Sequence, residues 1–210
     1  MIHIIDRLVL TKDGLFAKGT KQEIHLQQGS LDGACAVYSL MMCLIIIRKI
    51  KRRDVTDLDF SLSIDGRTSK GRLTRLFLDN QGLVRKGYFL NRLERDLLFS
   101  FRSKVETNYK QTSNNDYETL VEFLDNNNPV ELGFDKINRG GGHAVVAIGY
   151  EEFDNVVNIF CLDPGYPLFK GQIWNNILQI DINSKSKYNC INFQERSYIC
   201  INEMLVISSK

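Results

Sequence analysis

The chain has 210 residues, 43% of them hydrophobic and 25% charged, with a formal net charge of +2. This length and apolar content suffice for one hydrophobic core, so we expect a single domain over residues 1–210. The small net charge gives no support for nucleic-acid binding, and the five cysteines lack paired spacing, so we expect reduced thiols, no structural metal and no cofactor.

The N-terminal part is expected to hold two short strands and one long helix. Residues 2–10 and 22–27 are rich in β-formers on either side of a Lys-Asp-Gly turn at 12–14. Residues 35–50 are apolar on most sides and too short to span a bilayer, so they predict a buried helix and no membrane span. The basic residues between 48 and 53 are interpreted as its solvated end, where positive charge suits the helix dipole.

The start of the chain lacks the basic region, long apolar run and cleavage site of a signal peptide. We therefore expect a cytoplasmic protein, or one delivered by a secretion system that is independent of a signal peptide.

The rest of the chain changes from helical to extended patterns. Amphipathic spacing predicts helices over 70–79, 91–99 and 117–125, with a break at 82–87 and a polar loop over 103–116. Strands are predicted over 130–134, 144–150, 156–162 and 177–182, with a last strand or pair through 189–207. This order, helices first and strands second, indicates an α+β fold rather than alternating β-α-β units.

Basic and aromatic side chains recur between residues 67 and 102. We interpret them as solvated helix faces; the alternative is a surface for an acidic substrate or partner. They are Arg67, Arg72, Arg75, Arg85, Lys86, Tyr88, Arg92 and Arg95.

Cys35 is the candidate nucleophile because it follows Gly33 and begins the long apolar helix. A helix N-terminus lowers the pKa of a thiol, and the Cys35 amide has no acceptor within the helix, so it can donate to an oxyanion. Gln28 is the candidate second donor and Gln27 its alternative; the glycine that follows favours Gln28. The competing interpretation of Cys35 is a buried helix cysteine such as Cys43.

His143 is the candidate base because three glycines precede it and an apolar strand follows it. The glycines leave the ring accessible and the strand fixes its backbone, as a general base requires. The alternative is a glycine-rich hairpin with an incidental histidine. His3 and His25 lie in expected strands and are interpreted as packing or surface residues.

Asp163 is the candidate orienting group for the histidine ring. It ends the strand 156–162 and is followed by Pro-Gly, so an adjacent antiparallel strand would return it to the level of His143. Asn158 is the alternative, and a simple Asp-Pro-Gly turn is the other interpretation. The acidic residues at 151, 152 and 154 lie at the opposite end of the expected hairpin.

These segments resemble a papain-like cysteine peptidase, closest to the C39-like branch. Residues 33–39 (Gly-Ala-Cys-Ala-Val-Tyr-Ser) are similar to the nucleophile segment, and 143–150 to the histidine strand. Over 117–165 a helix, a Pro-Val strand, a Gly-His strand and a strand ending in Asp-Pro follow the order of the C39-like branch. The chain departs from papain in carrying Asp in place of Asn and Ala36 in place of an aromatic residue.

The resemblance implies roles for four residues: Cys35 as nucleophile, His143 as base and acid, Asp163 as orienting group and Gln28 as oxyanion donor. It implies a papain-like fold in which an N-terminal helical part, with the buried nucleophile helix, packs on a C-terminal antiparallel sheet. The whole chain would then be one papain-like (C39-like) catalytic domain.

The activity implied is a thiol hydrolase, most simply a peptidase that cleaves a protein substrate through a Cys-His-Asp triad and a thioester acyl-enzyme. The alternatives are a papain-like amidase, deamidase or acyltransferase, and a catalytically inactive papain-like binding module. A bacterial effector or toxin, with an inhibitor or immunity protein as partner, and a defence protease are both compatible with this reading.

Overall fold

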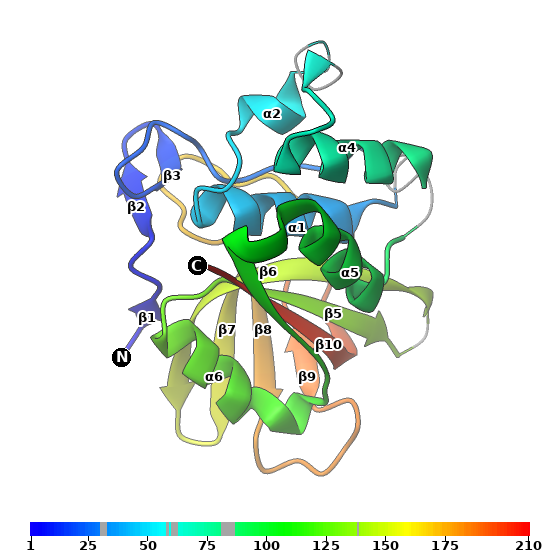
Figure 1. Cartoon of the computed structure of the whole chain (residues 1–210). Helices are drawn as coiled ribbons and strands as arrows, with labels where there is room; N and C mark the ends of the chain where they lie inside the picture. The colour runs from blue at the N-terminus through cyan, green and yellow to red at the C-terminus, as the bar shows by residue number, and fades with distance from the viewer. Residues whose placement is uncertain (30–32, 58, 60–62, 81–86, 138) are drawn as a thin grey trace.

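The second half of the chain builds an antiparallel barrel (Figure 1). The computed structural model describes residues 1–29, 33–57, 59, 63–80, 87–137 and 139–210. Within them, hydrogen-bonded pairing runs β6–β5–β10–β9–β8–β7 and returns from β7 to β6, while β4 pairs with β10 outside this ring. The strands are β4 (Val105–Gln111), β5 (Val130–Lys136), β6 (Arg139–Phe153), β7 (Val156–Leu162), β8 (Asn176–Asp181), β9 (Cys190–Asn192) and β10 (Ser197–Ser209).

The expected C-terminal antiparallel sheet is confirmed in its pairing, and the contact between β7 and β6 closes it into a barrel, which the sequence did not predict. β6 and β10 span 15 and 13 residues, so each reaches several partner strands along its length. Register shifts interrupt the ladders between Ala147 and Gly149 and between Ile201 and Glu203. Such bulges bend a strand and increase its twist, which allows β6 and β7 to pair and close the sheet.

β4 was missed, because residues 103–116 were expected to form a loop. The segment is mostly polar, but its residues pair with β10 from Val105 opposite Ser209 to Gln111 opposite Glu203. Alternating Val105, Thr107 and Tyr109 were the available strand signal. The next helix, α6 (Tyr117–Asp125), is confirmed at both ends, and a capping box between Ser113 and Asp116 precedes it.

The N-terminal segment is only partly extended. β1 (His3–Ile4) pairs with β6, and β2 (Leu8–Thr11) forms a hairpin with β3 (Gly14–Ala17) around the predicted turn. The strand predicted over 22–27 is wrong except for one bridge between Phe16 and Glu23. Hydrogen bonds from the Arg52 guanidinium to the carbonyls of Glu23 and His25 hold this segment instead. The basic residues between 48 and 53 therefore bind the segment 22–27 through Arg52, in addition to following a helix.

The predicted long helix is α1 (Cys35–Ile46), and every residue in it except Tyr38 is buried. It ends four residues earlier than expected, and Arg48 just beyond it has a φ of 61°, which helical backbone does not adopt. The Ser39 hydroxyl donates to the carbonyl of Ala144 at 3.2 Å and ties α1 to β6.

The described residues also form α2 (Arg53–Thr56), α4 (Ser69–Asp79) and α5 (Leu90–Phe101). Figure 1 shows α1, α2, α4 and α5 gathered on one side of the barrel and α6 lower down against it. In the described part of the chain no helix has the length and apolar character needed to cross a membrane. The break was predicted over 82–87, and residues 82–86 of it lie outside the described part of the chain.

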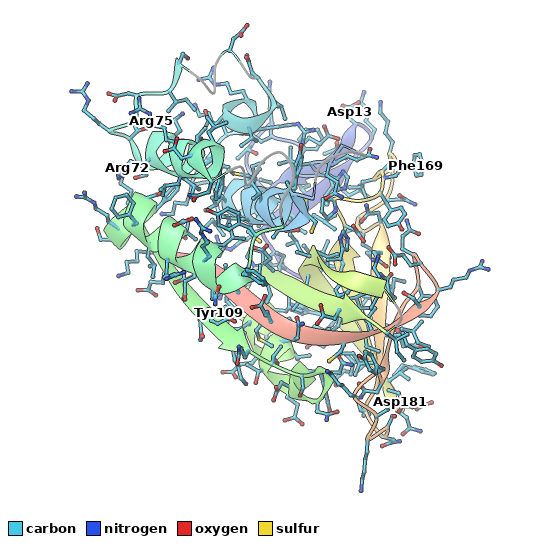
Figure 2. All side chains as sticks on the ribbon, turned by 90° about the vertical axis from the view of Figure 1, so that its right-hand side faces the viewer. Asp13, Arg72, Arg75, Tyr109, Phe169 and Asp181 are labelled. Carbon is cyan, nitrogen blue, oxygen red and sulfur yellow. The ribbon has the colours of Figure 1, made fainter. Side chains whose placement is uncertain are left out.

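The arginines between 67 and 102 mostly bind nearby groups of the chain. Arg72 donates to the carbonyls of Ser100 and Arg67, and Arg67 pairs with Asp65. Figure 2 shows Arg72 and Arg75 on α4 at one end of the molecule. Local bonding of this kind is typical of a helix surface. Arg85 and Lys86 lie outside the described residues.

Candidate active site

Cys35 is the first residue of α1 and lies at the edge of a cavity of about 730 Å³. The residue is 9% exposed. Burial opposes ionisation of its thiol, but the hydrogen bond and charge of His143, with the backbone amides of Ala144 and Ala36, outweigh it. The pKa of Cys35 is therefore lowered, which favours the thiolate form that acts as a nucleophile.

The other cysteines have the opposite electrostatics. All five lie within the described residues and are free and buried, and Cys35 is the one whose pKa is lowered. Burial raises the pKa of the other four thiols and keeps them protonated. They are Cys43, Cys161, Cys190 and Cys200.

His143 lies between the cysteine and a carboxylate. Its Nε2 is 2.7 Å from Oδ1 of Asp163, which leaves Nδ1 as the ring nitrogen for the thiol of Cys35. Phe134, opposite it on β5, packs edge-on against the ring with centroids 5.5 Å apart. Burial opposes its protonation, but the bonds to Asp163 and Cys35 raise the pKa of His143 to about 10. The arrangement favours a thiolate–imidazolium pair.

Asp163 follows β7 and is fully buried. Leu162 is paired with Val146, so Asp163 follows the ladder at the end of β7 that lies nearer His143, and its side chain reaches the histidine ring. Besides the histidine, Oδ1 accepts the amide of Gly165 at 2.8 Å, and Oδ2 accepts the side-chain amide of Asn176 at 2.9 Å. These bonds fix the carboxylate in the orientation that the histidine requires.

Three residues around this carboxylate were not recognised from the sequence as part of the site. Asn176 bonds the carboxylate, and Asn175 exchanges two hydrogen bonds with the backbone of Asp163. Buried His25, interpreted as a packing or surface residue, lies with Nε2 3.0 Å from the Asp163 carbonyl. The available signal was the Asn-Asn pair at the start of β8, since an antiparallel neighbour of β7 begins where β7 ends.

Gln28 is half-buried and its backbone amide donates to the carbonyl of Pro164 at 2.8 Å, which places it beside the Asp163 turn. Its side-chain Oε1 is buried without a hydrogen-bond partner among the described residues. Gln27 is exposed. The approach to Cys35 through residues 30–32 lies outside the described part of the chain.

The alternative to Asp163 lies elsewhere. Asn158 is paired with Glu151, well beyond His143 along β6, and accepts a hydrogen bond from Gln179. The acidic residues at 151, 152 and 154 lie at that same end, as expected.

Glu131 is a buried carboxyl close to the site that sequence inspection missed. It lies on β5, is 0% exposed, and neither carboxyl oxygen has a hydrogen-bond partner among the described residues. Burial, followed by the negative charges of Cys35 and Glu203, raises the pKa of Glu131 well above its usual range. A protonated Glu131 spares the Cys35 thiolate a buried negative neighbour.

No group of three or more His, Cys, Asp or Glu side chains in the described ranges is placed to hold a metal ion.

Two comparisons with known proteins gave different outcomes. A comparison with curated proteins returns no match to the chain. The model of the Peptidase_C39 like family matches residues 18–196, a span that includes Cys35, His143 and Asp163 together with β5 to β9. Because this match covers most of the sequence, the chain belongs to the Peptidase_C39 like family, whose members are of the cysteine-peptidase type.

Proposed function

We propose that this chain is a cysteine peptidase in which Cys35, His143 and Asp163 act as a catalytic triad. The observation that supports this most directly is the continuous contact from thiol to imidazole to buried carboxylate, with 2.7 Å between His143 and Asp163. The opposite pKa shifts of Cys35 and His143 favour the ion pair that thiol catalysis uses.

In the first half-reaction the Cys35 thiolate attacks the carbonyl carbon of the scissile amide. The backbone amide of Cys35 and the side-chain amide of Gln28 donate to the oxyanion. The His143 imidazolium then protonates the leaving amine, the C–N bond breaks and a thioester remains on Cys35. Asp163 holds the ring so that Nδ1 faces the sulfur throughout.

In the second half-reaction His143 is neutral and accepts a proton from water. The water oxygen attacks the thioester, Cys35 leaves as a thiolate, and the carboxylic acid product is released. We assign this chemistry to one catalytic domain over residues 1–210, because β1 and β10, near the two ends of the chain, pair into the same sheet.

The test compares purified wild type with Cys35→Ala and His143→Ala on a set of unmodified proteins. Both variants should lose activity, by about a thousandfold or more, with unchanged circular dichroism, because each removes a group that acts in every turnover. His3→Ala is the matched control, since His3 lies on β1 away from the cavity.

Mass spectrometry of the products identifies which amide bond is hydrolysed. New N-termini that depend on Cys35 establish peptide cleavage, whereas Cys35-dependent deamidation without cleavage would replace the peptidase proposal by an amidase. Undiminished turnover in Cys35→Ala would refute thiol catalysis altogether.

A further inference from the structure

The cavity beside Cys35 and His143 is also lined by two carboxylates, Asp135 on β5 and Glu203 on β10. Glu203 is paired with Gly133, and Asp135 with Gly142. A Cβ at Gly133 would lie 3.4 Å from Glu203 Oε2, and one at Gly142 would lie 3.6 Å from Asp135 Oδ1. The two glycines thus leave the space next to both carboxylates free for a ligand.

Hydrogen bonds orient these carboxylates without neutralising them. Oε1 of Glu203 accepts the phenol of Tyr109 at 2.8 Å, and Tyr109 lies on β4 beside β10 (Figure 2). Oδ2 of Asp135 accepts the side-chain amide of Asn202 at 2.7 Å. Within the described residues neither carboxylate forms an ion pair with a cation.

Besides His143, whose positive charge is balanced by the Cys35 thiolate, the described lining contains one cation, Lys187, which does not cancel the charge of the two carboxylates. Its side chain is exposed and its Nζ lies 5.6 Å from the ring centroid of Tyr188. The lining therefore carries two carboxylates against one lysine that is directed to its own neighbour. Glu203 is half-buried and Asp135 is exposed. Carboxylates in a cleft that have no ion-pair partner attract a cationic group and form strong charge-assisted hydrogen bonds with it.

We infer that this cavity binds a lysine or arginine side chain of the substrate beside the scissile bond, with Glu203 and Asp135 as the specificity-determining residues. The inference rests on the proposed function, because it assigns the substrate class of the same site. A volume of about 730 Å³ accommodates a long basic side chain together with flanking backbone.

The first measurement profiles cleavage of proteome-derived peptides prepared by digestion at acidic residues, which leaves lysine and arginine internal. Wild type should enrich lysine or arginine at one fixed position next to the cleaved bond. Glu203→Gln and Asp135→Asn should each reduce kcat/KM for those peptides by about fivefold, the factor that one part-exposed ion pair supplies. Glu106→Gln is the matched control and should leave the profile unchanged, because Glu106 is an exposed residue of β4 outside the cavity lining.

The second measurement does not depend on turnover. Cys35 is modified with aminoethyl methanethiosulfonate, a cation, and with sulfonatoethyl methanethiosulfonate, an anion, and both rates are normalised to mercaptoethanol. The cation should react faster, and the preference should fall in both carboxylate variants but not in Glu106→Gln.

The outcomes separate the inference from the proposed function. Cys35-dependent cleavage without enrichment of a basic residue overturns the inference and leaves the peptidase proposal intact. If no Cys35-dependent cleavage is found, the proposed function is overturned. If the preference for the cationic reagent is also equal in wild type and both carboxylate variants, the inference that the two carboxylates attract a cation is overturned as well.

Discussion

Replacing Glu131 by Gln should stabilise the protein increasingly as the pH rises. The carboxyl of Glu131 is fully buried and has no hydrogen-bond partner among the described residues, so ionisation inside the fold is strongly opposed. Glutamine has nearly the same shape and is neutral at every pH. The two side chains therefore differ in the fold by one titrating proton.

The sign follows from the direction of the shift. In the unfolded chain Glu131 ionises near its usual pKa of 4.5, whereas in the fold its pKa is raised, so above 4.5 the folded state holds more protons. Stability then falls with rising pH until the folded-state pKa is reached, at about 1.4 kcal/mol per pH unit. From about pH 5 to about pH 6.5, wild type should lose about 2 kcal/mol of unfolding free energy relative to Glu131→Gln.

The assay is urea unfolding of both proteins at several pH values, followed by tryptophan fluorescence. Glu106→Gln, at an exposed glutamate of β4, is the control and should track wild type at every pH. A constant difference between Glu131→Gln and wild type across this range would refute the reasoning, because it would mean that Glu131 is ionised or hydrated in the folded protein.

Two further predictions concern catalysis. The pH dependence of kcat/KM should be bell-shaped. Activity should rise as Cys35 ionises below the ordinary thiol pKa, and it should fall near pH 10 as His143 loses its proton. Steady-state rates with a cleaved peptide measure both limbs of the profile. An acid limb at or above the ordinary thiol pKa would contradict the ion pair. Gly165→Ala places a Cβ 3.1 Å from Asp163 Oδ1 and 3.5 Å from His143 Cε1. Because this contact displaces the two side chains from each other, kcat should fall about ten- to a hundredfold with little change in melting temperature. An unchanged kcat would show that the turn accommodates the methyl group without moving either side chain.

The sequence alone determined the elements whose signals are local. The apolar run from Cys35 predicts a buried helix and locates its N-terminus, and the Asp-Pro-Gly turn after residues 156–162 predicts that Asp163 lies at a strand end. The glycine tract before His143 predicts an accessible ring on a rigid strand. These features depend on periodicity and on residues with special backbone preferences, which are read within a few positions.

Only the tertiary structure decided how distant segments pair. Barrel closure depends on bulges in long strands. The polar segment of β4 is a strand because it pairs with β10. Asn176 bonds the Asp163 carboxylate because β7 and β8 are neighbours, and Glu131 is identified as a buried carboxyl only when α1 covers β5. Register and burial are set by contacts across the chain, and no local pattern in a single sequence encodes them.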